Sequence, residues 1–209
     1  MEIVGGEVAV LPEMVNGIDI SGTCLGYVEK GKVITGERCE SGDLIVALRS
    51  SGVHSNGLTL ARKVFQNAGY TMKDKVPGLS GTVGEELLTP TEIYVKDILR
   101  IRDEYDPHGL IDITGGGLRN LLRMRKGLRY IIDDPVKPQT LFGKIAELGE
   151  VSEREMYQTF NMGMGFMIVA SEDDAESMIS DIGDAEIVGR VEKGNGVLYE
   201  PGNLLYENY

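Results

Sequence analysis

The order of apolar and amphipathic segments after Ser41 is the feature that most constrains the fold of this chain. Four apolar runs are typical of buried strands: residues 42–48, 110–114, 128–133 and 165–170. Between them, apolar residues recur at spacings of three and four, as amphipathic helices require; one such series is Leu58, Ala61, Phe65 and Ala68. Strands that alternate with helices, with a pair of strands at the end, predict an α/β or α+β domain in which helices cover a mixed β-sheet.

Local signals predict where several helices begin. Thr89-Pro90-Thr91-Glu92 combines an N-cap threonine, a proline at the first helical position and a glutamate that completes a capping box. A second capping box begins at Ser152, and further helices are expected at 139–149 and 171–183. Gly194-Asn195-Gly196 is typical of a tight turn and predicts that the last two strands form a hairpin.

Residues 1–40 have a different pattern from the rest of the chain. Residues 3–10 and 18–28 are expected to be two strands interrupted by glycines. Because two strands alone cannot bury a core in water, they either join the following domain or are the remnant of a larger one. We therefore expect a boundary near residue 40, followed by an α/β domain at 41–209.

The composition excludes several classes of protein. The chain has 209 residues, of which 42% are hydrophobic and 26% charged, so it can bury a core. Its formal net charge of −12 disfavours binding to nucleic acid or anionic membranes, and it has no apolar run of membrane-spanning length and no secretion signal. Cys24 and Cys39 are the only cysteines, which excludes a CxxC zinc site and makes the cytoplasm the expected location.

Three glycine-rich loops each follow an apolar run: Val4–Glu7, Ser50–Gly57 and Thr114–Gly117. Glycines allow positive φ and close approach to a ligand, and free N–H groups at the start of a following helix can bind an anion. None of the loops has a Walker sequence or a complete GxGxxG arrangement. Each loop could equally be a tight turn where a helix packs closely on the sheet, and both interpretations stay open at this point.

A basic run follows the third loop, in what is expected to be a short helix; its members are Arg119, Arg123, Arg125, Lys126 and Arg129. Such a run is most often a solvated helix face. It could also attract a small phosphorylated ligand, and general binding of nucleic acid is the weakest of the three interpretations.

Polar side chains near these loops are candidates for chemistry. His54 can act as an acid or base near neutral pH, although a loop histidine is usually a surface residue. Ser55 and Asn56 follow it, and Ser55 could instead be the N-cap of the next helix. Thr159 and Asn161 interrupt an apolar segment, and since buried polar groups need partners, a ligand is one possible partner.

Four blocks of sequence resemble one family closely in their order and spacing: RSSGVHSNGLTLARKVF, LLTPTEIYVKDIL, HGLIDITGGGLRNLLR and EMYQTFNMGMGFMIV. Together they resemble the C-terminal domain of the aminoimidazole ribonucleotide synthetase family, the phosphoribosylformylglycinamidine cyclo-ligases of purine biosynthesis. VGGEVAVLPEMV and IDISGTCLGYVEKG resemble the last segment of that family's N-terminal domain. TGGG alone would also suit other members of the superfamily, whereas TFNMG together with SGVHSNG favours the cyclo-ligase.

The resemblance implies an enzyme that uses ATP and Mg²⁺ to phosphorylate the formyl amide oxygen of formylglycinamidine ribonucleotide. An amidine nitrogen then attacks the activated carbon, phosphate leaves and the imidazole ring closes. The family likeness implies catalytic roles for His54 and Asn161, a nucleotide contact for Gly5, Gly6 and Glu7, and magnesium binding by Glu7. The substrate-binding residues that it implies are Ser55, Asn56, Thr114, Gly115, Gly116, Gly117 and Thr159.

The chain departs from the family pattern in two ways. Family members carry a preceding segment with a glycine-rich nucleotide loop, whose motifs do not occur in this sequence, so most of the ATP site is expected to lie outside it. In addition, Val8 and Val10 stand where threonine and glutamate are usual, and Asp112 stands where a histidine is expected. These differences bear on metal binding and on acid–base chemistry.

Three hypotheses for function follow. The chain is the C-terminal part of a cyclo-ligase that needs an N-terminal half from a longer parent or a separate chain; or it is a non-catalytic module that binds a phosphoribosyl ligand or a partner; or it is another ATP-dependent member of the superfamily. Because unpaired strand edges invite association, residues 3–10 and 18–28 also predict a homodimer.

Overall fold

The computed structural model describes residues 2–10, 13 and 15–209, which divide into two units, Met1–Val33 and Ile34–Tyr209. Leu11, Pro12 and Met14 belong to the predicted N-terminal segment but lie outside the described residues. The division falls before the boundary that the sequence predicts at residue 40.

The described part of the first unit contains no β-strand, so the two strands predicted at 3–10 and 18–28 are wrong for this chain. Its regular structure is a single turn of 3₁₀ helix, η1 (Lys30–Lys32). Apolar side chains such as Ile3, Val8 and Ile18 are more than nine-tenths exposed. An extended segment becomes a strand only when a neighbouring strand satisfies its backbone groups, and no such neighbour is present in the described part of this unit.

The second unit is built on a seven-stranded mixed sheet with the order β2-β4-β1-β5-β3-β6-β7. The strands are β1 (Leu44–Arg49), β2 (Gly109–Asp112), β3 (Leu128–Ile132), β4 (Met164–Ala170), β5 (Ala185–Lys193), β6 (Gly196–Tyr199) and β7 (Leu204–Tyr206). β3 and β6 run parallel, and the other neighbouring strands run antiparallel. The mixed sheet with helices confirms the predicted α+β class.

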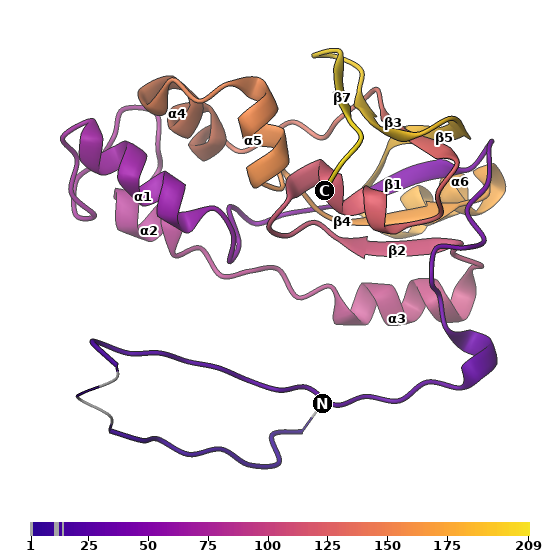
Figure 1. The fold of residues 1–209 in the computed structure, drawn as a ribbon, viewed down its shortest axis with the longest axis horizontal. Helices are drawn as coiled ribbons and strands as arrows, with labels where there is room; N and C mark the ends of the chain where they lie inside the picture. The colour runs from indigo at the N-terminus through magenta and orange to yellow at the C-terminus, as the bar shows by residue number, and fades with distance from the viewer. Residues whose placement is uncertain (1, 11–12, 14) are drawn as a thin grey trace. The chain divides into compact units, whose positions relative to one another are not determined.

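Helices cover both faces of the sheet (Figure 1). The larger core lies against α1 (Leu58–Asn67), α2 (Val83–Leu87), α4 (Thr140–Gly149), α5 (Glu153–Thr159) and the 3₁₀ helix η2 (Gly117–Arg123). The smaller core lies against α3 (Val95–Glu104) and α6 (Glu172–Asp181). Side chains of a strand alternate between the faces, so β1 contributes Ile45 and Ala47 to the larger core and Val46 and Leu48 to the smaller one.

The helix predicted to have its N-cap at Thr89 begins five residues further on, since the N-cap of α3 is Tyr94 and the helix starts at Val95. The capping box lies instead at Thr82 and Glu85, where each side chain accepts a hydrogen bond from the other residue's backbone N–H at the start of α2. Residues 89–93 are held in an extended path by the loop that follows β1. Ser51 donates to the carbonyl of Pro90 at 2.6 Å, and the backbone N–H of Glu92 reaches His54 Nε2 at 3.5 Å. Tertiary contacts therefore override a strong local signal.

The turn at 194–196 is present, but the hairpin predicted around it is wrong. β3 lies between β5 and β6, with Arg129 opposite Glu192 on one side and opposite Gly196 on the other. Because β3 already occupies that edge of β5, the chain passes the start of β3 and pairs with its far side. The hairpin that does form joins β6 to β7, with Val197 opposite Tyr206.

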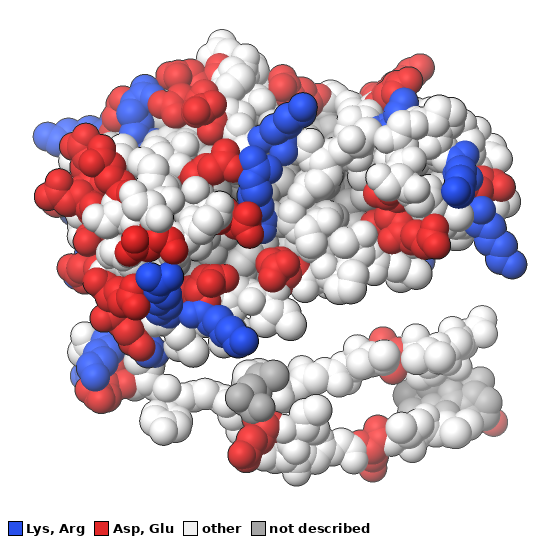
Figure 2. Space-filling view, turned by 180° about the vertical axis from the view of Figure 1, so that it is seen from behind, with Lys and Arg blue, Asp and Glu red and all other residues white. Residues whose placement is uncertain are grey.

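The surface is acidic, as the net charge of −12 requires. Acidic side chains are spread widely over the face seen in Figure 2, and basic side chains stand between them singly or in small groups. Many of the arginines pair with carboxylates, as Arg38 does with Asp106. No helix in the described residues is long and apolar enough to cross a membrane.

Candidate functional site

The loops after β1 and β2 leave the sheet at the same edge. Both strands pair antiparallel with β4, which lies between them, so β1 and β2 run in the same direction. Ser50–Gly57 follows β1, and Thr114–Gly117 follows β2. The loops meet at Asn56, whose Oδ1 lies 3.2 Å from the position that a Cβ would take on Gly115. The two loops therefore lie side by side where β1 and β2 end.

The three consecutive glycines are needed for three different reasons. A Cβ on Gly117 would lie 2.1 Å from the backbone oxygen of Tyr157, so this glycine allows η2 to pack directly on α5. Gly116 has a φ of +125°, which other residues rarely adopt. Gly115 is exposed and faces Asn56. Close packing therefore explains Gly117, whereas Gly115 is the exposed part of the loop and Gly116 is buried next to Tyr209.

Asn120 is a buried side chain that stabilises the conformation of the glycine loop. Its side chain is fully buried, and its Nδ2 donates to the carbonyl oxygens of Thr114 at 3.3 Å and of Gly117 at 2.9 Å. The backbone N–H of Gly117 also donates to Thr114 O at 3.0 Å. The N–H groups of Gly115 and Gly116 make no hydrogen bond to any other described residue. The loop thus presents two adjacent donors for which the described chain supplies no acceptor.

His54 is a buried histidine whose ring is fixed by the backbone. It is 7% exposed and adopts a left-handed φ of 56°. Its Nε2 accepts from the N–H of Ser51 at 3.2 Å and lies 3.5 Å from the N–H of Glu92. Burial lowers the pKa of His54 from its ordinary value of 6.5, and the nearby Glu92 opposes that change. The ring is therefore neutral with its proton on Nδ1, a state that suits positioning of the loop better than proton transfer from Nε2.

Asn161 joins the first loop to β4 through its buried amide. Its Oδ1 accepts from Ser50 Oγ and from the Gly163 N–H, both at 2.9 Å, and its Nδ2 donates to Gly52 O at 2.9 Å. These bonds use most of the capacity of the amide, and Asn161 is 3% exposed. The geometry favours a positioning role for Asn161 over direct contact with a reacting group.

The remaining predicted site residues are only partly brought together. Ser55 is exposed and lies 3.4 Å from the Thr91 hydroxyl, and the N-cap of α1 is Gly57 rather than Ser55. Thr159 ends α5 and donates to Glu155 at 3.0 Å. Gly5, Gly6 and Glu7 belong to the first unit, Met1–Val33.

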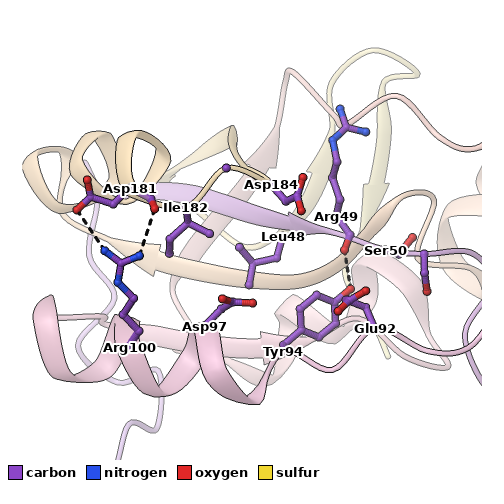
Figure 3. A pocket seen from close by; sticks show the side chains of 12 residues that line it. Leu48, Arg49, Ser50, Glu92, Tyr94, Asp97, Arg100, Asp181, Ile182 and Asp184 are labelled. Carbon is purple, nitrogen blue, oxygen red and sulfur yellow. Dashed lines mark hydrogen bonds and ion pairs between the residues drawn. The ribbon is translucent and has the colours of Figure 1, made fainter.

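Two hollows lie beside α3, and the first of them reaches the loop after β1. The first, about 440 Å³, extends from Ser50 and Ser51 to α6 (Figure 3). Its lining includes four carboxylates, those of Glu92, Asp97, Asp181 and Asp184, against the two arginines Arg49 and Arg100. Arg100 lies across the hollow from Asp181 and donates to its backbone carbonyl at 3.2 Å. This excess of negative charge disfavours a phosphate there.

The second hollow, about 450 Å³, is lined mainly by apolar residues of α3 and β4. Asp112, which stands where the family likeness expects a histidine, lies at its rim and is exposed. Tyr94 separates the two hollows, and its hydroxyl donates to Arg49 O at 2.8 Å. Burial is the main reason that the pKa of Tyr94 lies far above its ordinary value.

The basic run after the glycines is not a single solvated face. Arg119 and Arg123 lie at the glycine loop, whereas Arg125 donates to Cys39 O at 3.0 Å and Arg129 to Asn195 O at 3.3 Å. No ion pair joins Arg119 or Arg123 to a carboxylate within the described chain.

Residues that the sequence did not single out complete the site. Asn120 had a weak signal, as a polar residue between the apolar Leu118 and Leu121. Tyr209 had none, because the residue whose carbonyl it contacts, Gly115, is 94 positions away in the sequence. Across residues 2–10, 13 and 15–209 there is no group of three acidic, histidine or cysteine side chains placed to hold a metal ion.

The mixed sheet, its two helical layers and the pair of glycine-rich loops at one sheet edge define an α+β domain with an open loop site. The chain belongs to the AIR synthase-related family: the C-terminal domain of that family matches residues 40–199.

Curated relatives bear the name phosphoribosylformylglycinamidine cyclo-ligase. The relative from Methanopyrus kandleri is 49% identical over 205 residues, which is 94% of this chain and 59% of the relative. The relative from Methanocaldococcus jannaschii is 48% identical over 198 residues, or 91% of this chain and 56% of that protein. The chain therefore spans less than two thirds of the length of these relatives.

Solved structures share the fold at low sequence identity. Thiamine-monophosphate kinase from Stenotrophomonas maltophilia superposes with a TM-score of 0.53 at 20% identity, covering 83% of this chain and 54% of that one. The hydrogenase maturation protein HypE of E. coli superposes with a TM-score of 0.52 at 19% identity, covering 83% and 51%. At these identities the likeness supports the fold alone.

Proposed function

We propose that this chain forms the C-terminal part of a phosphoribosylformylglycinamidine cyclo-ligase and binds the phosphate group of its ribonucleotide at Thr114–Gly117. The observation that carries the proposal is the pair of free N–H groups on Gly115 and Gly116, beside two arginines without carboxylate partners. The names of relatives that are 48–49% identical support the activity.

The chain's own residues would bind and orient the substrate. Adjacent backbone N–H groups in a glycine turn suit a phosphate oxygen, and Arg119 and Arg123 supply positive charge in an otherwise acidic protein. Asn56, next to Gly115, would contact the ribonucleotide together with Ser55 and Thr159. His54 and Asn161 would hold the first loop in place. ATP would supply the phosphoryl group that activates the formyl oxygen.

Gly5, Gly6 and Glu7 are proposed to approach the nucleotide, with Glu7 as a magnesium ligand. The described residues offer no three-ligand group for a metal. We therefore assign no step to Mg²⁺ on the residues of this chain.

The proposed setting is a cytoplasmic assembly, either a homodimer or a complex with a separate chain that carries an N-terminal domain. The exposed apolar side chains at 3–10 and 18–28 support association, because such segments are normally covered. Sedimentation at micromolar concentration should show a species larger than the monomer, and a clean monomer would contradict this part.

A non-catalytic binding module is the second candidate. Asp112 and the two valines, Val8 and Val10, favour it, since they replace residues that the family likeness expects in acid–base and metal chemistry. Another ATP-dependent activity of the superfamily is a weaker third.

A coupled assay with formylglycinamidine ribonucleotide and ATP separates these candidates. The cyclo-ligase proposal expects ring closure when the chain is mixed with an N-terminal domain from a relative such as that of M. kandleri. Calorimetry with the ribonucleotide alone should show binding in either case. Binding without ring closure would favour the module, and no binding at all would contradict both.

A further inference from the structure

All four carbonyl oxygens of the Thr114–Gly117 loop accept hydrogen bonds. Asn120 Nδ2 donates to Thr114 O and Gly117 O. Gly116 O accepts from the backbone N–H of Arg119 at 3.1 Å and lies 3.4 Å from its Nε. The remaining oxygen, Gly115 O, accepts from the Tyr209 hydroxyl at 2.9 Å. Each carbonyl oxygen of the loop therefore has a donor within the described chain.

The geometry of the peptide bond then fixes the direction of the Gly116 N–H. In a trans peptide, the C=O of one residue and the N–H of the next point opposite ways in one plane. Tyr209 holds the oxygen of the Gly115–Gly116 peptide, so the Gly116 N–H points away from Tyr209. A peptide between two glycines otherwise rotates with little steric restriction. The hydroxyl thus selects one orientation of this peptide.

Tyr209 is itself held by cations rather than by the core. Arg123 donates to its hydroxyl, so the hydroxyl proton is left for Gly115 O at 2.9 Å, the nearer of two acceptors, with Asn120 Oδ1 at 3.3 Å. The guanidinium carbons of Arg119 and Arg123 lie 5.6 Å and 4.7 Å from the ring centroid, within cation–π range. The Tyr209 hydroxyl lies 3.0 Å from the position of a Cβ on Gly116, and the side chain is 58% exposed. Its contacts are therefore with the glycine loop and its arginines, and not with the hydrophobic core.

We infer that Tyr209 is a positioning residue of this site: its hydroxyl fixes the Gly115–Gly116 peptide so that the Gly116 N–H is presented to an anionic group. The inference rests on the proposed binding of a phosphate group at this loop. It names a residue whose ring and hydroxyl act through the backbone rather than on the ligand.

The test is a titration of the chain with inorganic phosphate, followed through the backbone amide resonances of Gly115 and Gly116. In the wild type, phosphate should shift both resonances. Tyr209→Phe keeps the ring and removes the hydroxyl, and it should weaken phosphate binding by roughly three- to ten-fold, as loss of one hydrogen bond implies. The ligand-free Gly116 resonance should also move.

Tyr206→Phe is the matched control. The Tyr206 hydroxyl donates to Arg154 O at 3.1 Å, so the change removes a hydroxyl from the same C-terminal segment without touching the glycine loop. Its phosphate affinity and its Gly116 resonance should equal those of the wild type. Unchanged or tighter phosphate binding in Tyr209→Phe would overturn the inference, since tighter binding would make Tyr209 a cover over the loop.

The outcomes separate this inference from the proposed function. Weaker phosphate binding in Tyr209→Phe, without ring closure in the coupled assay, would support the positioning role and contradict the cyclo-ligase. Ring closure together with equal phosphate affinity in the wild type and Tyr209→Phe would support the cyclo-ligase and contradict the positioning role. Failure of the wild-type amides to respond to phosphate would overturn the anion site and the role of Tyr209 together.

Discussion

Gly117 shows how a single missing methyl group can fix the position of a loop. Its φ is +53°, and the nearest atoms to an added Cβ are the backbone oxygens of Tyr157 and Phe160, at 2.1 Å and 2.9 Å. Backbone atoms cannot swing aside as a flexible side chain can. Any side chain here must therefore displace η2 from α5, together with the glycine loop that precedes it.

Gly117→Ala should lower the free energy of unfolding by about 2–4 kcal/mol, through overpacking and a strained φ together. Urea denaturation provides the measurement. Gly143→Ala is the matched control, because Gly143 is an exposed position within α4 and a Cβ there meets nothing within 4 Å. The control should be stabilised by about 0.5–1 kcal/mol. Equal effects of the two substitutions would contradict the packing argument.

His54 should make stability depend on pH in a defined window. In the unfolded chain the imidazole takes up a proton near pH 6.5, but in the folded chain it does so only at lower pH, because burial lowers its pKa. Between these two values the unfolded state binds more protons, so stability falls as pH falls. The loss should begin near pH 6.5 and be complete below the lowered pKa.

Urea midpoints measured between pH 7.5 and pH 5 test this effect. His54→Asn keeps a residue that tolerates positive φ, and it should flatten the pH dependence relative to the wild type, whatever its absolute stability. All other titrating groups are the same in both proteins. Parallel pH profiles would show that the folded and unfolded states bind the His54 proton equally.

At the scale of the element, Thr82 and Thr89 both have the local sequence of a helix N-cap, but only Thr82 caps a helix. Thr82 caps α2 with a reciprocal box: its Oγ1 accepts from the Glu85 N–H at 3.2 Å, and Glu85 accepts from the Thr82 N–H at 2.8 Å. Thr89 has the better cap sequence but caps nothing, because the loop after β1 holds the residues that follow it in an extended path.

Thr82→Ala should therefore cost about 1 kcal/mol of stability, as loss of an N-cap does. Thr89→Ala should change the free energy of unfolding by less than about 0.5 kcal/mol, like most surface substitutions. Chemical denaturation of both variants provides the comparison. A larger loss for Thr89→Ala would mean that the helix starts where the local sequence predicts.

At the scale of the whole molecule, stability resides in the second unit. Its strands divide their side chains between two cores, and both cores consist of residues from Ile34 onward. The described side chains of the first unit are exposed throughout. The first unit therefore adds little buried apolar area to the folded chain.

At a protein concentration low enough for the chain to be monomeric, removal of residues 1–33 should leave the urea midpoint unchanged. The slope of the transition should also stay the same, because unfolding exposes the same surface. Circular dichroism during the titration provides the measurement. If the shortened monomer were less stable, residues 1–33 would have to pack on the rest of the chain.

The site could be predicted in part, and particular residues show where the prediction stopped. Glycine-rich loops at Ser50–Gly57 and Thr114–Gly117 are visible in the sequence, and their shared sheet edge follows from strand direction. The sequence did not distinguish Gly117, which packs on α5, from Gly115, which is exposed. That distinction depends on the distance to Tyr157, which the local sequence does not contain.

What the sequence by itself determined is the kind of most elements after residue 41, since apolar periodicity and glycine turns act over a few residues. It also determined the family, because four separated blocks keep their order and spacing. Only the tertiary structure decided that β3 lies between β5 and β6, that residues 89–93 stay extended, and that Tyr209 reaches Gly115. Each of these depends on a contact between distant segments, and such contacts form only when burial of the whole core outweighs local preference.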